Sequence, residues 1–220
     1  MRKYFKYFIY LYVLIGYSLS NAGSYEDFFS AITFDRPEVI EKLLARGFDP
    51  NTPSEKGVPA LMVALQSEAP KSALLLAKHP KTKVEFENRL GETPLMLAAI
   101  QNQLELANLL ISRGAEVNRK GWTPLHYAAT RGHREMMRLL LDHDAYIDSE
   151  SANGTTPLMM AAYTAPPLAV KLLLEEGADP TLVNDGNASA LDLAITAERE
   201  QSAFYIRAFI ESWHIQNPTE

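Results

Sequence analysis

The sequence predicts an all-α repeat solenoid, in which short helix–turn–helix units stack side by side. The first observation is an apolar segment that recurs along the chain, in its best copies with a pair of alanines. The copies begin at Phe28, Leu61, Leu95, Leu125, Leu158 and Leu191, so they lie 33, 34, 30, 33 and 33 residues apart. The second observation is that another apolar segment follows each copy. Two helical segments in every period are typical of a solenoid, because one such unit cannot bury its apolar face alone.

The first helix of each unit is predicted from a proline near its start. Thr-Pro pairs precede the three most regular copies, at 93–94, 123–124 and 156–157. Proline suits the first helical position because its missing N–H needs no partner there, and threonine can cap the helix. The alanine pairs that follow allow neighbouring helices to approach closely.

The second helix of each unit is predicted from leucine-rich segments. These include residues 39–46, 104–113, 136–143 and 170–176. Gly47, Gly114 and Gly177 follow three of them, where a residue with left-handed backbone commonly ends a helix. A polar stretch of about ten residues then leads to the next unit. The sequence therefore predicts six helix pairs joined by polar loops.

The unit with the most regular sequence carries Thr-Pro-Leu-His-x-Ala at 123–128, preceded by Gly-Ala-Glu-Val-Asn at 114–118. With these motifs and this period, the chain resembles ankyrin-repeat proteins. Its phrases GWTPLHYAA and NGTTPLMMAA are similar to those of small ankyrin proteins exported by Gram-negative bacteria. The resemblance implies stacked helix pairs with hairpin-like finger loops. It divides the chain into an N-terminal capping repeat at 23–54, repeats at 55–88, 89–118, 119–151 and 152–184, and a degenerate C-terminal capping repeat at 185–220.

Residues 1–22 have the layout of a secretory signal peptide. A basic start with Arg2, Lys3 and Lys6 is followed by an apolar stretch at about 7–17 and by small residues that end at Ala22. We expect cleavage after Ala22, with no membrane insertion of the mature chain. The alternative is an uncleaved anchor, but the apolar stretch is shorter than the roughly 20 residues of a spanning helix. The protein is therefore expected to be exported and periplasmic, or secreted.

Composition narrows the classes of partner. The chain has 21 basic and 27 acidic residues, and removing residues 1–22 takes away three basic residues and no acidic one, which leaves 18 against 27, or a charge of −9. Such an acidic chain argues against nucleic acid or anionic lipid as the main partner. The chain has no cysteine, so packing alone must stabilise it even in an oxidising compartment.

The candidate catalytic groups all have structural explanations. The resemblance implies that His126 and His133 belong to the repeat pattern and tie one unit to the next. Asp142, His143 and Asp144 are adjacent on one helix end, and neighbours on a helix point in different directions. There is no cysteine nucleophile, serine elbow or glycine-rich phosphate loop. We therefore expect no enzyme activity, no cofactor and no metal site.

The resemblance implies that a protein partner meets the finger tips and the exposed positions of the first helices. Carried over by position, the predicted contact residues are Arg89, Leu90, Glu92, Ile100, Gln101, Arg119, Lys120, Trp122, Thr130, Arg131, Asn153, Tyr163 and Thr164, with Ala152 and Thr155 at equivalent positions. Trp122, Tyr163 and Arg131 are of the types that dominate binding energy in interfaces. The alternative is that all of these are ordinary solvated repeat positions.

Two departures from the repeat pattern stand out. Gly114 and Gly121 are seven residues apart where other units have ten, so three residues are missing from a finger tip. The sequence predicts a notch there, bordered by Arg119, Lys120 and Trp122, that is basic and aromatic. The second departure is Ala165, which replaces the turn glycine and precedes Pro166, and which predicts a reshaped turn and a possible recognition feature.

The function expected from the sequence is that of an exported, non-enzymatic module that binds a protein partner, itself a monomer. Two alternatives remain open. The chain could be an accessory or regulatory subunit of a periplasmic enzyme, or an effector secreted into a host cell. The sequence does not name the partner.

Overall fold

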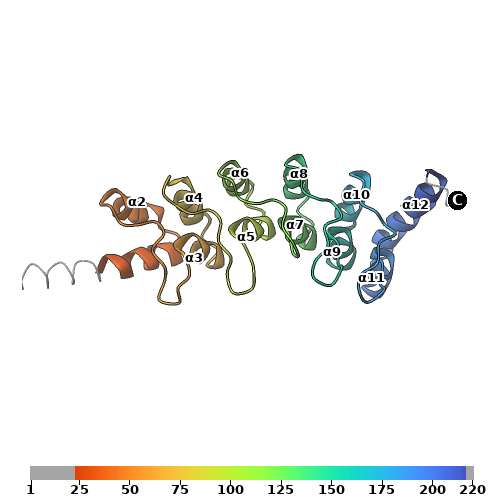
Figure 1. The fold of residues 1–220 in the computed structure, drawn as a ribbon, viewed down its shortest axis with the longest axis horizontal. Coiled ribbons are helices and arrows are strands. Elements are labelled where there is room, and N and C mark those ends of the chain that lie inside the picture. Colours follow the sequence, from red (N-terminus) through yellow and green to blue (C-terminus); the bar gives the residue numbers. More distant parts are fainter. Residues whose placement is uncertain (1–22, 217–220) are drawn as a thin grey trace, which may run out of the picture. The chain divides into compact units, whose positions relative to one another are not determined.

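The structure, a computed structural model, describes residues 23–216, with side chains as far as residue 212. The predicted signal peptide and the last four residues of the predicted C-terminal repeat lie outside the described residues. The described residues divide into two compact units, which we call unit 1 (residues 23–83) and unit 2 (residues 84–216). In both units the described residues form helices joined by turns and loops (Figure 1).

Unit 1 contains the first two helix pairs. Residues 23–33 are helical, and α2 (Pro37–Ala45), α3 (Ala60–Gln66) and α4 (Pro70–Lys78) follow. Helix α4 packs against both α2 and α3. Phe28, Ile40 and Met62 are fully buried between these helices, which accounts for the apolar spacing seen in the sequence.

Unit 2 contains four helix pairs. They are α5 (Pro94–Ile100) with α6 (Leu104–Ser112), α7 (Pro124–Arg131) with α8 (Arg134–Asp142), α9 (Pro157–Thr164) with α10 (Pro167–Glu175), and α11 (Ala190–Thr196) with α12 (Glu200–Gln216). The first helices pack in the order α5, α7, α9, α11, and the second helices pack in the order α6, α8, α10, α12 (Figure 1). The predicted fold class, an all-α repeat solenoid, is confirmed.

The alanine pairs and the threonine caps have the roles that the sequence predicts. The two pairs at 98–99 and 128–129 have no exposed area, and adjacent first helices pack against each other there. Thr93 Oγ1 accepts a hydrogen bond from the Met96 N–H at 3.3 Å, and Thr156 Oγ1 accepts one from the Met159 N–H at 3.3 Å. Each cap satisfies one backbone N–H at the start of a helix that otherwise lacks a partner.

The backbone conformation of the turn within each helix pair depends on the residue at the turn position. Gly132 has a φ of +70°, and Asn102 and Glu198, which replace glycine, have φ values of +56° and +55°. Ala165 instead has an extended backbone, with φ −88° and ψ 162°. The predicted change of shape in this turn is confirmed, because alanine followed by proline disfavours the left-handed conformation.

Apart from two isolated bridges at 53–59 and 183–189, the described residues form no extended pairing that counts as a strand. Along residues 23–216, each helix is too short or too polar to span a lipid bilayer.

Candidate functional site

Four of the five loops between helix pairs are hairpin-like fingers with the same hydrogen bonds. In each, a polar residue donates its N–H to the carbonyl four residues later and accepts that residue's N–H through its side chain. The four pairs are Ser54 with Val58, Asn88 with Glu92, Ser151 with Thr155, and Asn184 with Ala188. A residue with positive φ, three positions after the first, closes each turn. The predicted hairpin-like fingers are therefore confirmed.

The loop between Gly114 and Gly121, which we call the short finger (residues 115–122), has no such tip. Only Arg119 and Lys120 join Asn118 to Gly121, and no backbone hydrogen bond of the described chain closes this stretch into a hairpin. The Asn118 side chain instead bonds the next finger: Nδ2 donates to the Asp144 carbonyl at 2.6 Å, and Oδ1 accepts the Tyr146 N–H at 2.8 Å. The base of the short finger is thus fixed although its tip is absent.

The charge around the short finger is mixed, whereas the sequence predicted a basic border. Arg119 forms an ion pair with Glu87, with 2.6 Å between Nη2 and Oε1. Its charge is therefore compensated. Lys120 and Arg131 remain exposed, so the basic character is smaller than predicted.

Two residues that the sequence prediction omitted complete this cluster. They are Glu87 and Tyr127, whose hydroxyl donates to Glu92 Oε1 at 3.1 Å. Burial, and then the charge of Glu92, raise the pKa of Tyr127 to about 12. Arg119 and Glu87 are 32 residues apart and Tyr127 and Glu92 are 35 apart, which is close to one repeat. A donor and a carboxylate one repeat apart, of opposite charge in the case of Arg119 and Glu87, were therefore the available signal.

His126 is a structural residue, as predicted. Its Nδ1 accepts the Thr123 backbone N–H at 3.2 Å, so its Nε2 carries the proton and donates to the Thr155 carbonyl at 2.9 Å. The ring is fully buried, and burial lowers its pKa to about 4. This neutral histidine ties α7 to the following finger. A protonated ring would place two N–H groups against each other at Thr123.

Several predicted contact residues also link neighbouring turns. His133 Nε2 bonds the Ile100 carbonyl at 2.9 Å, and the Thr164 hydroxyl donates to the Thr130 carbonyl at 2.7 Å. Arg199 then donates to the Thr164 carbonyl at 2.7 Å. This series of bonds connects the turns of four successive helix pairs. Ile100, Thr130 and Thr164 are half-buried, and they hold the repeats in register whatever else they contact.

The predicted contact residues differ in exposure. The exposed ones are Arg89, Leu90, Lys120, Trp122, Arg131, Asn153 and Tyr163, with Ala152 beside them. The half-buried ones are Glu92, Ile100, Gln101, Arg119, Thr130 and Thr164. The prediction for Thr155 is wrong, because Thr155 is buried at the base of a complete hairpin, where its N–H bonds the Ser151 side chain.

The reshaped turn at Ala165 is packed inside unit 2. Ala165 has no exposed area, and a Cβ added to Gly132 would lie 2.7 Å from Pro166 Cδ. The turn therefore fits closely against Gly132 of the preceding pair. Arg199 bonds the Ala165 carbonyl at 3.2 Å. The exposed groups available for recognition near this turn are Tyr163, Pro166 and Leu168, whereas Ala165 is buried.

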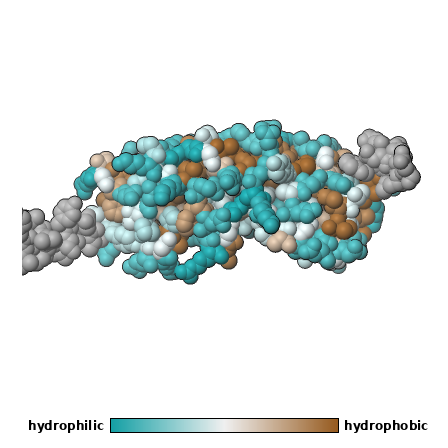
Figure 2. All heavy atoms as spheres, in the orientation of Figure 1, coloured by the Kyte–Doolittle hydropathy of each residue, from teal (hydrophilic) through white to brown (hydrophobic). Residues whose placement is uncertain are grey.

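The surface around these residues is polar, with few large apolar side chains. The face drawn in Figure 2 is mostly hydrophilic, and its hydrophobic residues form small separate areas. Within the described residues, no three histidine or carboxylate side chains lie close enough together to hold a metal ion. Asp142, His143 and Asp144 are exposed at the end of α8.

Comparisons with known proteins agree with this geometry. A family model described as ankyrin repeats (3 copies) matches residues 28–121 and 118–184. The chain is 30% identical over 146 residues to the rat ankyrin repeat and SAM domain-containing protein 6, covering 66% of this chain but 13% of that protein. It is 32% identical over 161 residues to the chicken nuclear factor NF-kappa-B p105 subunit, covering 70% of this chain and 16% of that protein. Among solved structures, an ankyrin repeat domain from Acinetobacter baumannii matches with a TM-score of 0.71 and 25% identity, over 84% of this chain and 97% of that one.

Proposed function

Because this chain belongs to the ankyrin-repeat family, we propose that it is a non-enzymatic module that docks a protein partner on the fingers and first helices of unit 2. The observation that carries the proposal is the exposure of large apolar side chains at these positions. Leu90 is 82% exposed, Tyr163 48% and Trp122 40%, although the rest of each first helix is mostly buried. Aromatic residues that stay exposed on a rigid scaffold are the usual anchors of an interface.

The short finger supports this choice of surface. At the position of Trp122, the complete fingers carry Val58, Glu92, Thr155 and Ala188, of which Thr155 is buried and the other three are half-buried. The missing hairpin tip therefore leaves the indole accessible next to the exposed Lys120. The indole packs edge-on to the His126 ring, with centroids 5.2 Å apart, so it is held in one orientation. A held side chain loses less entropy on binding than a free one.

The test is a double variant, Trp122→Ala with Arg131→Ala, used to capture the partner from a periplasmic extract with crosslinking and mass spectrometry. We expect capture to fall at least about tenfold, since each lost anchor in an interface costs on the order of 1 to 2 kcal/mol. The matched control removes one aromatic and one arginine elsewhere in unit 2, as Phe204→Ala with Arg207→Ala, both exposed on α12. Equal capture by the two double variants would contradict the proposed surface.

We also propose that the protein is exported and works in the periplasm. The support is the sequence of residues 1–22, which has the layout of a secretory signal peptide. N-terminal sequencing of the protein from its native organism should give Gly23 as the first residue, and fractionation should find it in the periplasm. An uncleaved chain would contradict export by a signal peptide. A cleaved chain in the medium or in a host cell would instead favour the secreted effector.

A further inference from the structure

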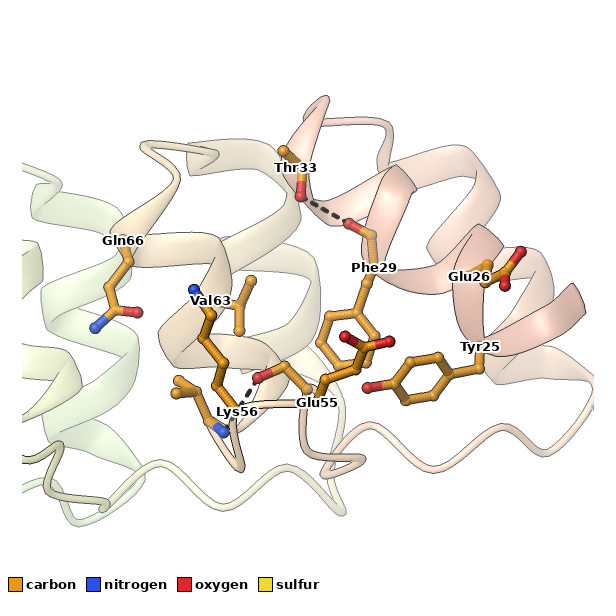
Figure 3. A pocket seen from close by; sticks show the side chains of 10 residues that line it. Tyr25, Glu26, Phe29, Thr33, Glu55, Lys56, Val63 and Gln66 are labelled. Carbon is orange, nitrogen blue, oxygen red and sulfur yellow. Dashed lines mark hydrogen bonds between the residues drawn. The ribbon is translucent and has the colours of Figure 1, made fainter. Parts of the chain in front are cut away.

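Unit 1 contains a cavity that shares no residue with the proposed contact surface of unit 2. Its volume is about 450 Å³, and it lies between the helix at 23–33, the finger at 54–58 and helix α3. Figure 3 shows the rings of Tyr25 and Phe29 extending from their helix toward the finger residue Glu55, with Lys56 running alongside Val63. A cavity of this size can accept a large side chain of another molecule.

The floor of the cavity is a fixed pair of aromatic rings. The centroids of Tyr25 and Phe29 lie 4.9 Å apart, one helical turn apart in sequence. The Tyr25 hydroxyl donates to the Pro53 carbonyl at 3.2 Å, which fastens this ring to the finger. The Phe29 ring packs edge-on against Phe28, which is fully buried. Both rings are therefore held in place before any ligand arrives.

Most polar groups around these rings can accept a hydrogen bond, and the Ser54 hydroxyl and the Gln66 amide can also donate. The carboxylates of Glu26 and Glu55 line the cavity, and neither has an ion-pair or hydrogen-bond partner in the described part of the chain. The Tyr25 and Thr33 hydroxyl protons are already donated to backbone carbonyls, so their oxygens can only accept further bonds. Lys56 is the one cation that lines the cavity, against two anions.

We infer that this cavity binds an arginine side chain of a protein partner. Aromatic faces attract a cation through the negative face of the ring, and a planar guanidinium can stack on them while it donates to carboxylates at the rim. The net negative charge and the acceptor-rich lining match such a group and oppose an anion. The role in partner binding rests on the proposed function, but the chemistry of the cavity can be tested without the partner.

The experiment is an NMR titration of the ¹⁵N-labelled protein with N-acetyl-arginine amide. The neutral isostere N-acetyl-citrulline amide is the control probe. We expect shift changes confined to residues 25–33, 54–58 and 63–66, with a dissociation constant on the order of millimolar for the arginine probe. Citrulline should bind about tenfold or more weakly, because it lacks the charge. Equal shifts with both probes, or arginine-induced shifts spread over the surface, would overturn the inference.

Three variants test which groups carry the selectivity. Glu26→Gln with Glu55→Gln keeps the shape of the rim and should weaken arginine binding about tenfold. Lys56→Gln removes the competing cation and should strengthen it, whereas a role of Lys56 as the anchor for an anion predicts the reverse. Asp142→Asn, an exposed carboxylate in unit 2, should leave binding unchanged. If Lys56→Gln weakens the arginine complex, the assignment is wrong.

The outcome is separable from that of the proposed function. Loss of arginine binding in the glutamate double variant, with capture of the partner unchanged, would remove the cavity from the interface and leave the unit 2 surface standing. If the protein binds arginine but captures no partner, the inference about the cavity is supported and the proposed function is not.

Discussion

Replacing Gly132 by alanine tests how closely the altered turn at Ala165 fits its neighbour. Two costs add at this position. The backbone has a φ of +70°, which costs an alanine about 1 kcal/mol relative to glycine. The new Cβ would also lie 2.7 Å from Pro166 Cδ and 3.2 Å from the Ala165 Cβ, in a turn that has little room to move. Overpacking of this kind costs about 1 to 3 kcal/mol, so the expected total is roughly 3 kcal/mol.

The matched control is Gly114→Ala, which separates strain from crowding. Gly114 has a φ of +91°, and its added Cβ would meet no atom within 4 Å. It should therefore lose only about 1 kcal/mol. Urea unfolding followed by circular dichroism at 222 nm gives both free energies from the midpoint and slope. A Gly132→Ala variant no less stable than Gly114→Ala would refute the reasoning, since it would mean that the turn at Ala165 moves aside freely.

Two further predictions concern bonds between neighbouring repeats. The pKa of His126 is about 4 in the folded chain and 6.5, its ordinary value, in the unfolded chain. The unfolded chain therefore takes up a proton at this residue below pH 6.5, whereas the folded chain does so only near pH 4. Stability that is present above pH 6.5 is consequently lost as the pH falls through this window. At pH 5 the expected loss of unfolding free energy is about 2 kcal/mol. When urea unfolding is repeated across this pH range, a His126→Gln variant should lack this loss. Arg199→Ala should lower the free energy of unfolding by about 1 to 3 kcal/mol, because two turn carbonyls lose their charged donor; the neighbouring exposed Arg207→Ala should change it by less than about 0.5 kcal/mol.

The repeats themselves were predictable because each relies on short-range rules. The Thr-Pro starts, the alanine pairs and the spacing of positive-φ turn residues all act within a few residues of one another. The left-handed turn at Glu198 shows where such rules weaken, since glutamate has no preference for that backbone and the position in the repeat imposes it. The altered turn at Ala165 was also predictable, because alanine replaces the turn glycine there and a proline follows it.

The candidate site was less predictable because it depends on residues one repeat apart. The Arg119–Glu87 ion pair and the Tyr127–Glu92 bond each join residues of neighbouring repeats in unit 2. Their geometry follows from how neighbouring helix pairs stack. The burial of Thr155 has the same origin. The sequence placed it at the same repeat position as Trp122, but a complete hairpin covers one and the short finger leaves the other exposed.

This contrast between Thr155 and Trp122 gives a final prediction. If the missing tip is what exposes the indole, then inserting three residues after Asn118, to restore the ten-residue spacing, should cover it. Trp122 is one of two tryptophans, so a Trp213→Phe background isolates its fluorescence. Acrylamide should quench Trp122 less in the insertion variant, because its exposed fraction should fall from 40% toward the lower exposure of Val58 and Glu92 at the same finger position.

The same insertion should also weaken partner capture, because the anchor is no longer accessible. An insertion of three residues after Gly186, in a complete finger that carries none of the predicted contact residues, is the control and should change neither measurement. If quenching is unchanged in the Asn118 insertion variant, the exposure of Trp122 does not depend on the short finger. The identification of the short finger as a binding feature would then fail, while the repeat architecture would be unaffected.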